Sequence, residues 1–425
     1  MTSYQSAKLI RLLQNGLSTG TLLHKIYNSL LNRYEIAAGK TFLRSKPLSG
    51  IFSPASTCNY RCKFCESDSQ LKSVQTRFAN TITAKDFAAL DFFGKHTWSV
   101  SFFGNIGEPL LNREFTEIAR GLKKKGAYLS VNTNGSLLSK EVSRKLVNMG
   151  FDDILVSFHA GTKQTYDFLQ NKSFNLVCDN ISYLTSIKKQ YPKVFFNFAL
   201  NRINGPEIYK FVALCKKLRI DGISANHYYH TRNAFENDIS YWDDPQHGNQ
   251  LIDKIYELGQ SRELLVLPEK RHYLITSNSS EGSQNDEQEQ KVKQKKNSLC
   301  PLPFQYLNFY GSFSEKDFYD VRVCNRFFLF KLNYRQFLGQ KIDVIWNHPV
   351  LQYLRKTSGN NPICRFCRSK EIKRLRNLNN NEYRKRRDAS VRDFFQEAWK
   401  QPGIDKNVRG LTVLKENLYE GESDQ

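Results

Sequence analysis

The chain lacks any apolar run approaching the roughly 20 residues that a membrane-spanning helix requires. Its first residues, "MTSYQSAKLIRLLQNGLSTG", contain neither a continuous apolar stretch nor a small-residue cleavage site, so they do not have the features of a secretory signal. These two absences predict a cytoplasmic protein. In that compartment thiols stay reduced, and clustered cysteines indicate metal binding rather than disulfides.

Acidic residues are also scarce, since 41 Asp and Glu stand against 63 Lys and Arg and give a formal net charge of +22. Such a surplus favours acidic partners such as nucleic acid, an anionic membrane or an anionic substrate. A solvated basic surface explains the surplus at least as well. Hydrophobic residues (40%) and aromatic residues (13%) are at the levels of an ordinary globular protein, and 425 residues leave room for more than one module.

Between about residues 50 and 230, short β-rich apolar runs alternate with amphipathic helical stretches. The runs are "GIFSPAS", "WSVSFFG", "AYLSVNT", "DDILVSFH", "VFFNFAL" and "GISANHYY". This alternation is typical of parallel βα units, so it predicts an α/β fold with functional residues at the carboxyl ends of the strands. Periodicity does not distinguish an open sheet from a partial barrel. Helix starts are predicted at Thr83, Asn112 and Ser139, and helix ends at Gly126 and Gly150.

The pattern divides the chain into six parts. They are a helical N-terminal segment (1–45), a βα core (46–235), a helical connection (236–275), a flexible linker (276–298), a small loop-rich extension (299–370) and a basic C-terminal tail (371–425). The linker is assigned because residues 276–298 have almost no apolar side chains and cannot bury enough surface to fold.

The stretch "CNYRCKFC" places Cys58, Cys62 and Cys65 directly after the first predicted strand. Thiolates are soft ligands that favour iron–sulfur clusters, zinc or copper(I). Structural zinc nearly always has four protein ligands, and the nearest histidine in the sequence is His96. Three cysteines on one tight loop can instead bind three corners of a cubane and leave one iron open for another ligand. A zinc site completed by a remote residue is the alternative.

This motif, with Phe64 just before the last cysteine, resembles the signature of the radical SAM superfamily. Three later segments resemble those of the same superfamily in the same order. "FGNIGEPLLN" is similar to its Gly-Glu-Pro motif, "VNTNGSLL" to its Thr-Asn-Gly segment, and "ILVSFHAGTKQTYDFL" to its fourth-strand segment. Ile106 departs from the usual glycine before Gly107. The resemblance covers roughly residues 45–230 and implies a partial (β/α)6 barrel.

The resemblance implies that Cys58, Cys62 and Cys65 bind three irons of a [4Fe–4S] cluster, while S-adenosylmethionine chelates the fourth. One-electron reduction would then cleave S-adenosylmethionine to a 5′-deoxyadenosyl radical, which abstracts hydrogen from the substrate. A reducing partner such as flavodoxin or ferredoxin is implied as well. The residues expected at the cofactor are Phe64, Gly107, Glu108, Asn132, Asn134 and Ser157.

Two of these positions also make physical sense. Glycine at position 107 lets the backbone approach a cofactor closely. The carboxylate of Glu108 can accept hydrogen bonds from an ammonium group. The alternatives are a solvated loop acid for Glu108 and a turn-forming residue for Asn134.

Four more cysteines follow the linker, and their surroundings resemble the SPASM or twitch extension of radical SAM enzymes. The matching order is Cys300, Gly311, Cys324, Trp346, Arg355, Cys364 and Cys367. The resemblance implies that the four thiolates bind one auxiliary [4Fe–4S] cluster. No cysteine follows Cys367, so a second auxiliary cluster is not expected. A zinc ribbon-like site is the alternative, because a Cys-x-x-Cys pair also permits it.

A two-electron oxidation would need a base, and His159, His227, Tyr228 and His230 lie near predicted strand ends. A structural or surface role is the alternative for each of them. The extension occurs in relatives that modify peptides and in others that oxidise sugars or aminocyclitols. The sequence shows no clear room for a leader-recognition domain, which favours a small-molecule or glycan-type substrate over a peptide.

A second hypothesis is a basic RNA-modifying or nucleic-acid-binding protein with structural zinc at the late cysteines. The basic stretch from Arg365 to Arg387 could contact phosphates. That stretch has few aromatic residues on which bases could stack. We therefore expect a radical SAM enzyme, and nucleic acid is a partner that the sequence permits but does not favour.

Overall fold

The computed structural model describes residues 3–65, 81–104, 107–170, 173–228, 239–241, 244–267, 300–311, 316–323, 329–368, 380–404 and 408–413. The expected linker 276–298, Ile106, His230 and Cys324 lie outside the described residues. In the described part, no helix is both long enough and apolar enough to cross a membrane.

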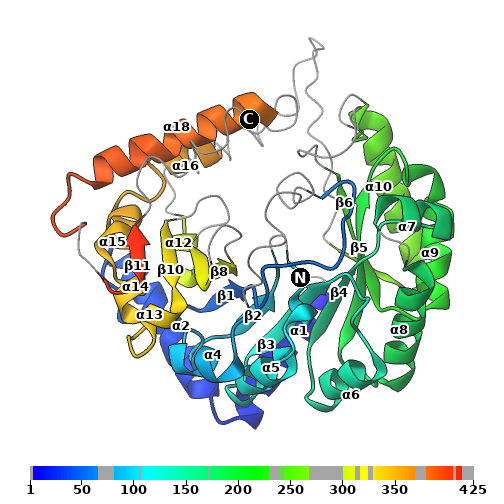
Figure 1. Ribbon diagram of the computed structural model, residues 1–425, viewed down its shortest axis with the longest axis horizontal. Helices are drawn as coiled ribbons and strands as arrows, with labels where there is room; N and C mark the ends of the chain where they lie inside the picture. The colour runs from blue at the N-terminus through cyan, green and yellow to red at the C-terminus, as the bar shows by residue number, and fades with distance from the viewer. Residues whose placement is uncertain are drawn as a thin grey trace.

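One sheet runs through the described part, with eleven strands in the order β11-β10-β9-β8-β1-β2-β3-β4-β5-β6-β7. The eight strands from β8 to β7 in this order are parallel. Figure 1 shows the sheet as an arc with helices on its outer side. The strands are β1 (Ser49–Phe52), β2 (Ser99–Phe102), β3 (Tyr128–Thr133), β4 (Asp153–Ser157), β5 (Lys193–Leu200), β6 (Gly222–His227), β7 (Leu265–Leu267), β8 (Tyr306–Gly311), β9 (Phe318–Arg322), β10 (Phe330–Asn333) and β11 (Leu411–Val413).

The α/β fold and the six predicted core strands, β1 to β6, are confirmed. The helices that follow them along the chain pack against the sheet and bury its apolar outer face. These helices are α4 (Ala84–Leu90), α5 (Phe115–Lys124), α6 (Lys140–Asn148), α7 (Lys163–Leu169), α8 (Phe174–Ile187), α9 (Ile208–Lys217) and α10 (Pro245–Gln260), with short 3-10 helices at Pro109–Leu111 and Gly205–Glu207.

Most of the predicted helix ends are confirmed. The side chains of Thr83 and Ser139 accept the capping hydrogen bonds of α4 and α6, and Gly126 and Gly150 have the positive φ values of helix ends. The predicted start at Asn112 is wrong, because α5 begins at Phe115. The side-chain amide of Asn112 donates instead to the carbonyls of Pro54 and Ile82, so this residue anchors the loop.

The extension that carries the late cysteines continues the core sheet, because β8 pairs in parallel with β1. Its strands β9, β10 and β11 then pair antiparallel. Part of the expected basic tail is folded here as well: α18 packs on α16, and Phe394 and Phe395 are buried. The helices of this region are α12 (Leu302–Gln305), α13 (Tyr334–Phe337), α14 (Asp343–Trp346), α15 (Pro349–Lys356), α16 (Pro362–Arg368) and α18 (Asn380–Ala398).

The N-terminal segment forms two helices, α1 (Ser3–Ser18) and α2 (Leu22–Ala37), as predicted. Both contact the amino ends of the strands. The hydroxyl of Tyr4 donates to Asp153, the first residue of β4, at 2.6 Å. The side chain of Asn32 on α2 donates to the carbonyl of Phe304, just before β8, at 2.7 Å. The two helices therefore cover the end of the sheet opposite to the carboxyl ends of the strands.

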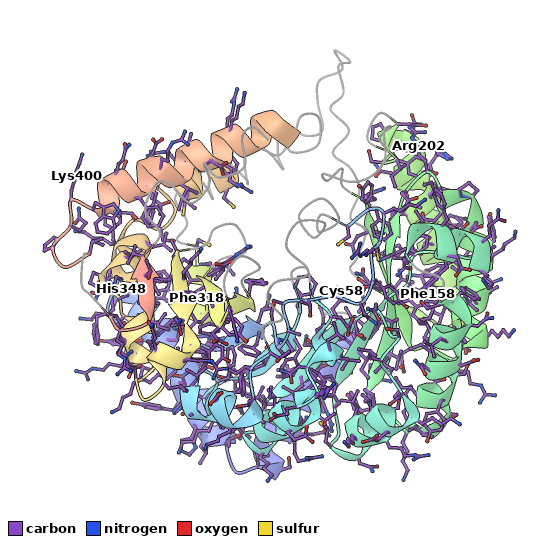
Figure 2. All side chains as sticks on the ribbon, viewed as in Figure 1. Cys58, Phe158, Arg202, Phe318, His348 and Lys400 are labelled. Atoms are coloured by element: carbon purple, nitrogen blue, oxygen red, sulfur yellow. The ribbon has the colours of Figure 1, made fainter. Side chains whose placement is uncertain are left out.

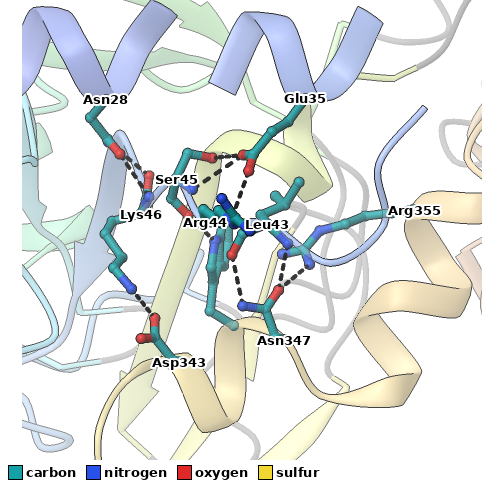
Figure 3. A network of polar contacts seen from close by, with 10 residues as sticks. Asn28, Glu35, Leu43, Arg44, Ser45, Lys46, Asp343, Asn347 and Arg355 are labelled. Atoms are coloured by element: carbon teal, nitrogen blue, oxygen red, sulfur yellow. Dashed lines mark hydrogen bonds and ion pairs between the residues drawn. The ribbon is translucent and has the colours of Figure 1, made fainter. Parts of the chain in front are cut away.

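A buried polar network, drawn in Figure 3, joins the N-terminal segment to the extension. The carboxylate of Glu35 accepts from the backbone N–H groups of Arg44 and Ser45 and from the Ser45 hydroxyl. The guanidinium of Arg355 on α15 donates to the carbonyls of Pro303 and Thr41, each at 3.0 Å. These contacts join the N-terminal segment to the extension at the amino ends of β1 and β8.

The network yields a stability prediction for Glu35→Ala. The change leaves three donors without their acceptor, so we expect the free energy of unfolding to fall by about 2–4 kcal/mol. Urea unfolding followed by circular dichroism measures it. The control is Glu257→Ala, whose exposed carboxylate pairs with Lys254, with an expected change below about 0.5 kcal/mol. Equal effects in the two variants would contradict the role of Glu35.

Candidate active site

The inner face of the arc is polar. Ser101 and Ser130 lie side by side on β2 and β3, with their hydroxyl oxygens 2.7 Å apart. Ser157 on β4 is in register with Asn197 on β5, which is in register with Ser224 on β6. These side chains are half-buried, while their neighbours along each strand are buried. This alternation indicates that the inner face of the parallel sheet is accessible to solvent, whereas most parallel sheets are covered on both faces.

Two of the expected cofactor residues belong to this face. The hydroxyl of Ser157 donates to the side-chain carbonyl of Asn132 at 3.2 Å, across β4 and β3. Ser101, Ser130, Asn197 and Ser224 were not selected from the sequence. The period-two polar pattern in "WSVSFFG", "AYLSVNT" and "GISANHYY" could have identified the three serines.

The cysteine loop follows β1 at the carboxyl end of the sheet, and Figure 2 labels Cys58 there, on the inner side of the arc. The Sγ atom of Cys58 accepts from the backbone N–H of Tyr60 at 3.4 Å. The N–H of Cys65 donates to the carbonyl of Cys62 at 3.0 Å, which makes a turn. A further bond of 2.9 Å, from the Lys63 N–H to the carbonyl of Leu169, holds this turn against the end of α7.

Glu108 joins the loops that follow β1, β2 and β3. Its backbone N–H donates to the carbonyl of Thr57 at 2.8 Å. Its carboxylate accepts from the Thr133 hydroxyl at 2.6 Å, from the Asn134 N–H at 2.7 Å and from the Leu110 N–H at 3.1 Å. The side chain is 2% exposed. Burial raises the pKa of Glu108 to about 7 from the ordinary 4.5, against the lowering effect of these three hydrogen bonds.

Two glycines make this contact between loops possible. A Cβ atom on Gly107 would lie 2.2 Å from the carbonyl oxygen of Ala55, in the loop after β1. A Cβ atom on Gly311, at the end of β8, would lie 2.9 Å from the Cβ of Ser56. No other residue fits at such backbone approaches without displacing the chain. The extension therefore packs directly against the segment that leads into Cys58.

Asn134 connects the Thr-Asn-Gly segment to the cysteine loop. Its side-chain amide donates to the side-chain oxygen of Asn59 at 2.8 Å and lies 3.9 Å from the Sγ of Cys58. Its own side-chain oxygen accepts from the N–H and the hydroxyl of Ser136. The amide is therefore both a turn-forming group and a neighbour of the first thiol.

Phe64 packs between two of the candidate catalytic residues. Its ring meets the ring of His159 edge to face at 5.0 Å, and the ring of Tyr228 lies 6.1 Å from it. These contacts fix the end of the cysteine loop against the carboxyl ends of β4 and β6. Phe64, His159 and Tyr228 are thus brought together, although no signal in the sequence indicated that these three residues meet.

His159 is poorly placed to act as a base. Its Nδ1 accepts a hydrogen bond of 3.0 Å from the Ala199 N–H, so the neutral ring carries its proton on Nε2. Burial lowers the pKa of His159 to about 3, which keeps the ring neutral. The geometry favours a structural role for this residue. His227 is also buried, and its Nε2 lies 3.2 Å from the side-chain oxygen of Asn249 on α10.

The late cysteines lie in the extension. Cys364 and Cys367 are one turn apart on α16, and Asn361 caps that helix by accepting from the Cys364 N–H at 2.8 Å. The hydroxyl of Ser358 donates to the carbonyl of Cys300 at 3.2 Å, which brings the Cys300 segment to the start of α16. All three cysteines are half-buried, reduced thiols.

The donor set of the first loop fits an iron–sulfur cluster, since three thiols on one loop are half-buried beside close-packed glycines. As the side chains stand, no three Cys, His, Asp or Glu groups among the described residues are gathered tightly enough to hold a metal ion. Burial raises the pKa of the Cys58 thiol to about 12. A bound metal would supply the positive charge that stabilises the thiolates.

Comparison with known families gives a match to the radical SAM superfamily over residues 52–215. A probable GTP 3′,8-cyclase from Saccharolobus islandicus is 34% identical over 173 residues, which are 39% of this chain and 52% of that protein. One from Pyrobaculum aerophilum is 35% identical over 109 residues, 26% of this chain and 34% of that protein. The chain thus matches about half the length of the first relative and less of the second.

Among solved structures, SuiB from Streptococcus suis bound to S-adenosylmethionine is similar, with a TM-score of 0.53 and 18% sequence identity. The match covers 76% of this chain and 71% of SuiB. The complex of SuiB with its precursor peptide SuiA matches with a TM-score of 0.50 and 16% identity, over 76% of this chain and 69% of SuiB. At this level of identity the likeness is one of fold.

The burial of Glu108 yields a pH prediction. Its pKa is higher in the folded protein than in the unfolded chain, so its contribution to stability is present below pH 4.5 and is lost as the pH rises through 7. Relative to Glu108→Gln, the wild type should lose up to about 3 kcal/mol of unfolding free energy between pH 5 and pH 8. Urea unfolding at each pH measures it. A pH-independent difference, or the opposite slope, would contradict this account.

Proposed function

We propose, from the match of residues 52–215 to the radical SAM superfamily, that this chain reductively cleaves S-adenosylmethionine and abstracts a hydrogen atom from a polar substrate. One observation supports this proposal above all others. The CxxxCxxC loop packs against the Gly-Glu-Pro and Thr-Asn-Gly segments, and Glu108, Gly107 and Asn134 make the contacts. A structural zinc site would not need these three loops to meet.

Cys58, Cys62 and Cys65 are the proposed ligands of a [4Fe–4S] cluster. When bound, that cluster supplies the electron that splits S-adenosylmethionine and so provides the 5′-deoxyadenosyl radical for hydrogen abstraction. Gly107 lets the backbone approach the cofactor closely, and Glu108 holds the surrounding loops in place. Asn134 and Phe64 orient the cysteine loop from its two sides.

The polar inner face of the sheet favours a substrate rich in hydroxyl or amide groups. Asn132 and Ser157, with the serines and Asn197 beside them, can exchange hydrogen bonds with such groups. This supports a small-molecule or glycan-type substrate. A peptide is the second candidate, since the similar protein SuiB has been solved with its precursor peptide. For proton transfer we propose His227 and Tyr228 rather than His159, whose Nδ1 already accepts a hydrogen bond.

The proposed ligands of an auxiliary [4Fe–4S] cluster are Cys300, Cys364 and Cys367, with Cys324 as the fourth thiolate. The supporting observations are the pair of thiols one turn apart on α16 and the hydrogen bond from Ser358, just before that helix, to the carbonyl of Cys300. Such a cluster would pass electrons to or from the substrate, or stabilise the extension. The proposed reductant of the first cluster is a flavodoxin or ferredoxin.

The first test replaces Cys58, Cys62 or Cys65 by Ala. After anaerobic reconstitution with iron and sulfide, each variant should lose S-adenosylmethionine cleavage by at least about 100-fold, because one cluster ligand is gone. The control is Cys178→Ala, a half-buried thiol on α8 that should leave cleavage unchanged. Chromatography of 5′-deoxyadenosine measures the rate. Colourless wild-type protein with bound zinc and no cleavage would refute the proposal.

The second test concerns the auxiliary site. Cys364→Ala should retain most of the uncoupled cleavage of S-adenosylmethionine, because the first loop and its contacts are intact, while the iron content falls by about four atoms per chain. Iron and acid-labile sulfide analysis, paired with the cleavage assay, measures both. Unchanged iron content would show that Cys364 is not a cluster ligand. Equal loss of cleavage and secondary structure would show a role in folding alone.

A further inference from the structure

The N-terminal helices carry an apolar face that points away from the protein. Ten of the fourteen exposed large hydrophobic side chains among the described residues lie between Leu9 and Phe42. On α1 they are Leu9, Ile10, Leu13 and Leu17, and on α2 they are Leu23, Ile26, Tyr27, Leu30 and Tyr34. Together with Phe42 we call them the α1–α2 apolar face. A cluster of this kind on a protein surface marks an interaction site.

The orientation of α2 is fixed by its polar side. The buried residues of this helix are Lys25, Asn28, Asn32 and Glu35, all on one stripe of the helix. Lys25 donates to the carbonyl of Thr97, and Asn28 exchanges two hydrogen bonds with the backbone of Lys46. Figure 3 shows Asn28 and Glu35 projecting from α2 toward the loop that holds Ser45.

This arrangement is the reverse of an ordinary surface helix, which buries its apolar side. Rotating α2 about its axis to bury its apolar side chains would break all of these hydrogen bonds. The apolar side chains therefore stay exposed to solvent. The same holds for α1, where Asn15 and Arg11 bind the buried carboxylate of Asp152 at 3.1 and 2.8 Å.

The charge around this face selects its partner. Residues 1–46 contain seven Lys or Arg and a single acid, Glu35, whose carboxylate is buried and hydrogen-bonded. Lys25 is buried and Arg11 and Lys46 are ion-paired, while Arg33, Lys40 and Arg44 are exposed. A second copy meeting the first across a two-fold axis would bring these like charges together. Anionic lipid attracts them, and an apolar helix face beside Lys and Arg is the pattern of helices that lie in the membrane interface.

We propose that the α1–α2 apolar face docks on the surface of an anionic phospholipid membrane, where the exposed cations Arg33, Lys40 and Arg44 meet the phosphate headgroups. Helices α1 and α2 cover the amino ends of the strands. Docking through their outer face therefore leaves the carboxyl ends, with the cysteine loop, turned away from the lipid. The inference is independent of the proposed chemistry, because none of its residues belongs to the cysteine site.

The test is flotation of the full chain with vesicles of phosphatidylcholine mixed with phosphatidylglycerol, and with vesicles of phosphatidylcholine alone. The variant is Leu23→Gln with Tyr27→Gln, whose side chains are 77% and 68% exposed. The matched control is Leu176→Gln with Tyr209→Gln, a leucine and a tyrosine on α8 and α9 that are 50% and 56% exposed. Circular dichroism confirms that both variants are folded.

Wild type and control should float with the mixed vesicles and release at high salt, while the α2 variant should bind at least about tenfold more weakly. Equal binding of variant and control, or equal binding to both kinds of vesicle, would overturn the proposal. So would a salt-stable dimer in size-exclusion chromatography that the α2 variant abolishes, since a second copy would then cover the face. Absence of binding to either vesicle would overturn it as well.

Discussion

The buried carboxylate of Glu108 fastens the loops that follow three neighbouring strands. Its two oxygens accept from Thr133, Asn134 and Leu110, and its backbone N–H reaches Thr57 in the loop after β1. These loops can meet only because Gly107 has no side chain. This contact positions the cysteine loop at the carboxyl end of the sheet. It also places the side chain of Asn134 close to Cys58.

The two ends of the sheet are therefore built differently. At the carboxyl end, backbone and small polar groups come together around half-buried thiols, which suits a cofactor. At the amino end, α1 and α2 cover the strands with buried polar groups and leave an apolar surface outside. The extension contacts both ends of the sheet. Strand β8 pairs with every residue of β1, and Arg355 donates a hydrogen bond to the carbonyl of Thr41 in the N-terminal loop.

The sequence predicted the parts of this structure that depend on local pattern. The six core strands and the caps at Thr83 and Ser139 follow from periodicity and chain order. The contacts of Phe64 with His159 and Tyr228 were not predicted, because they join residues far apart in the sequence. The parallel pairing of β8 with β1 was not predicted, because nothing local in "YLNFYG" specifies a partner more than 250 residues earlier. The inner row of serines was not predicted, because the apolar residues that identify a strand do not indicate which of its faces lines a site.

The most direct test of the central claim is the electron paramagnetic resonance spectrum of the reconstituted, reduced protein before and after addition of S-adenosylmethionine. A variant with Cys300, Cys364 and Cys367 replaced by Ala removes the auxiliary signal, so that only a cluster at Cys58, Cys62 and Cys65 contributes. An open iron at this loop predicts a changed spectrum when S-adenosylmethionine binds. A spectrum that does not change, or protein that takes up zinc and no iron, would contradict the account.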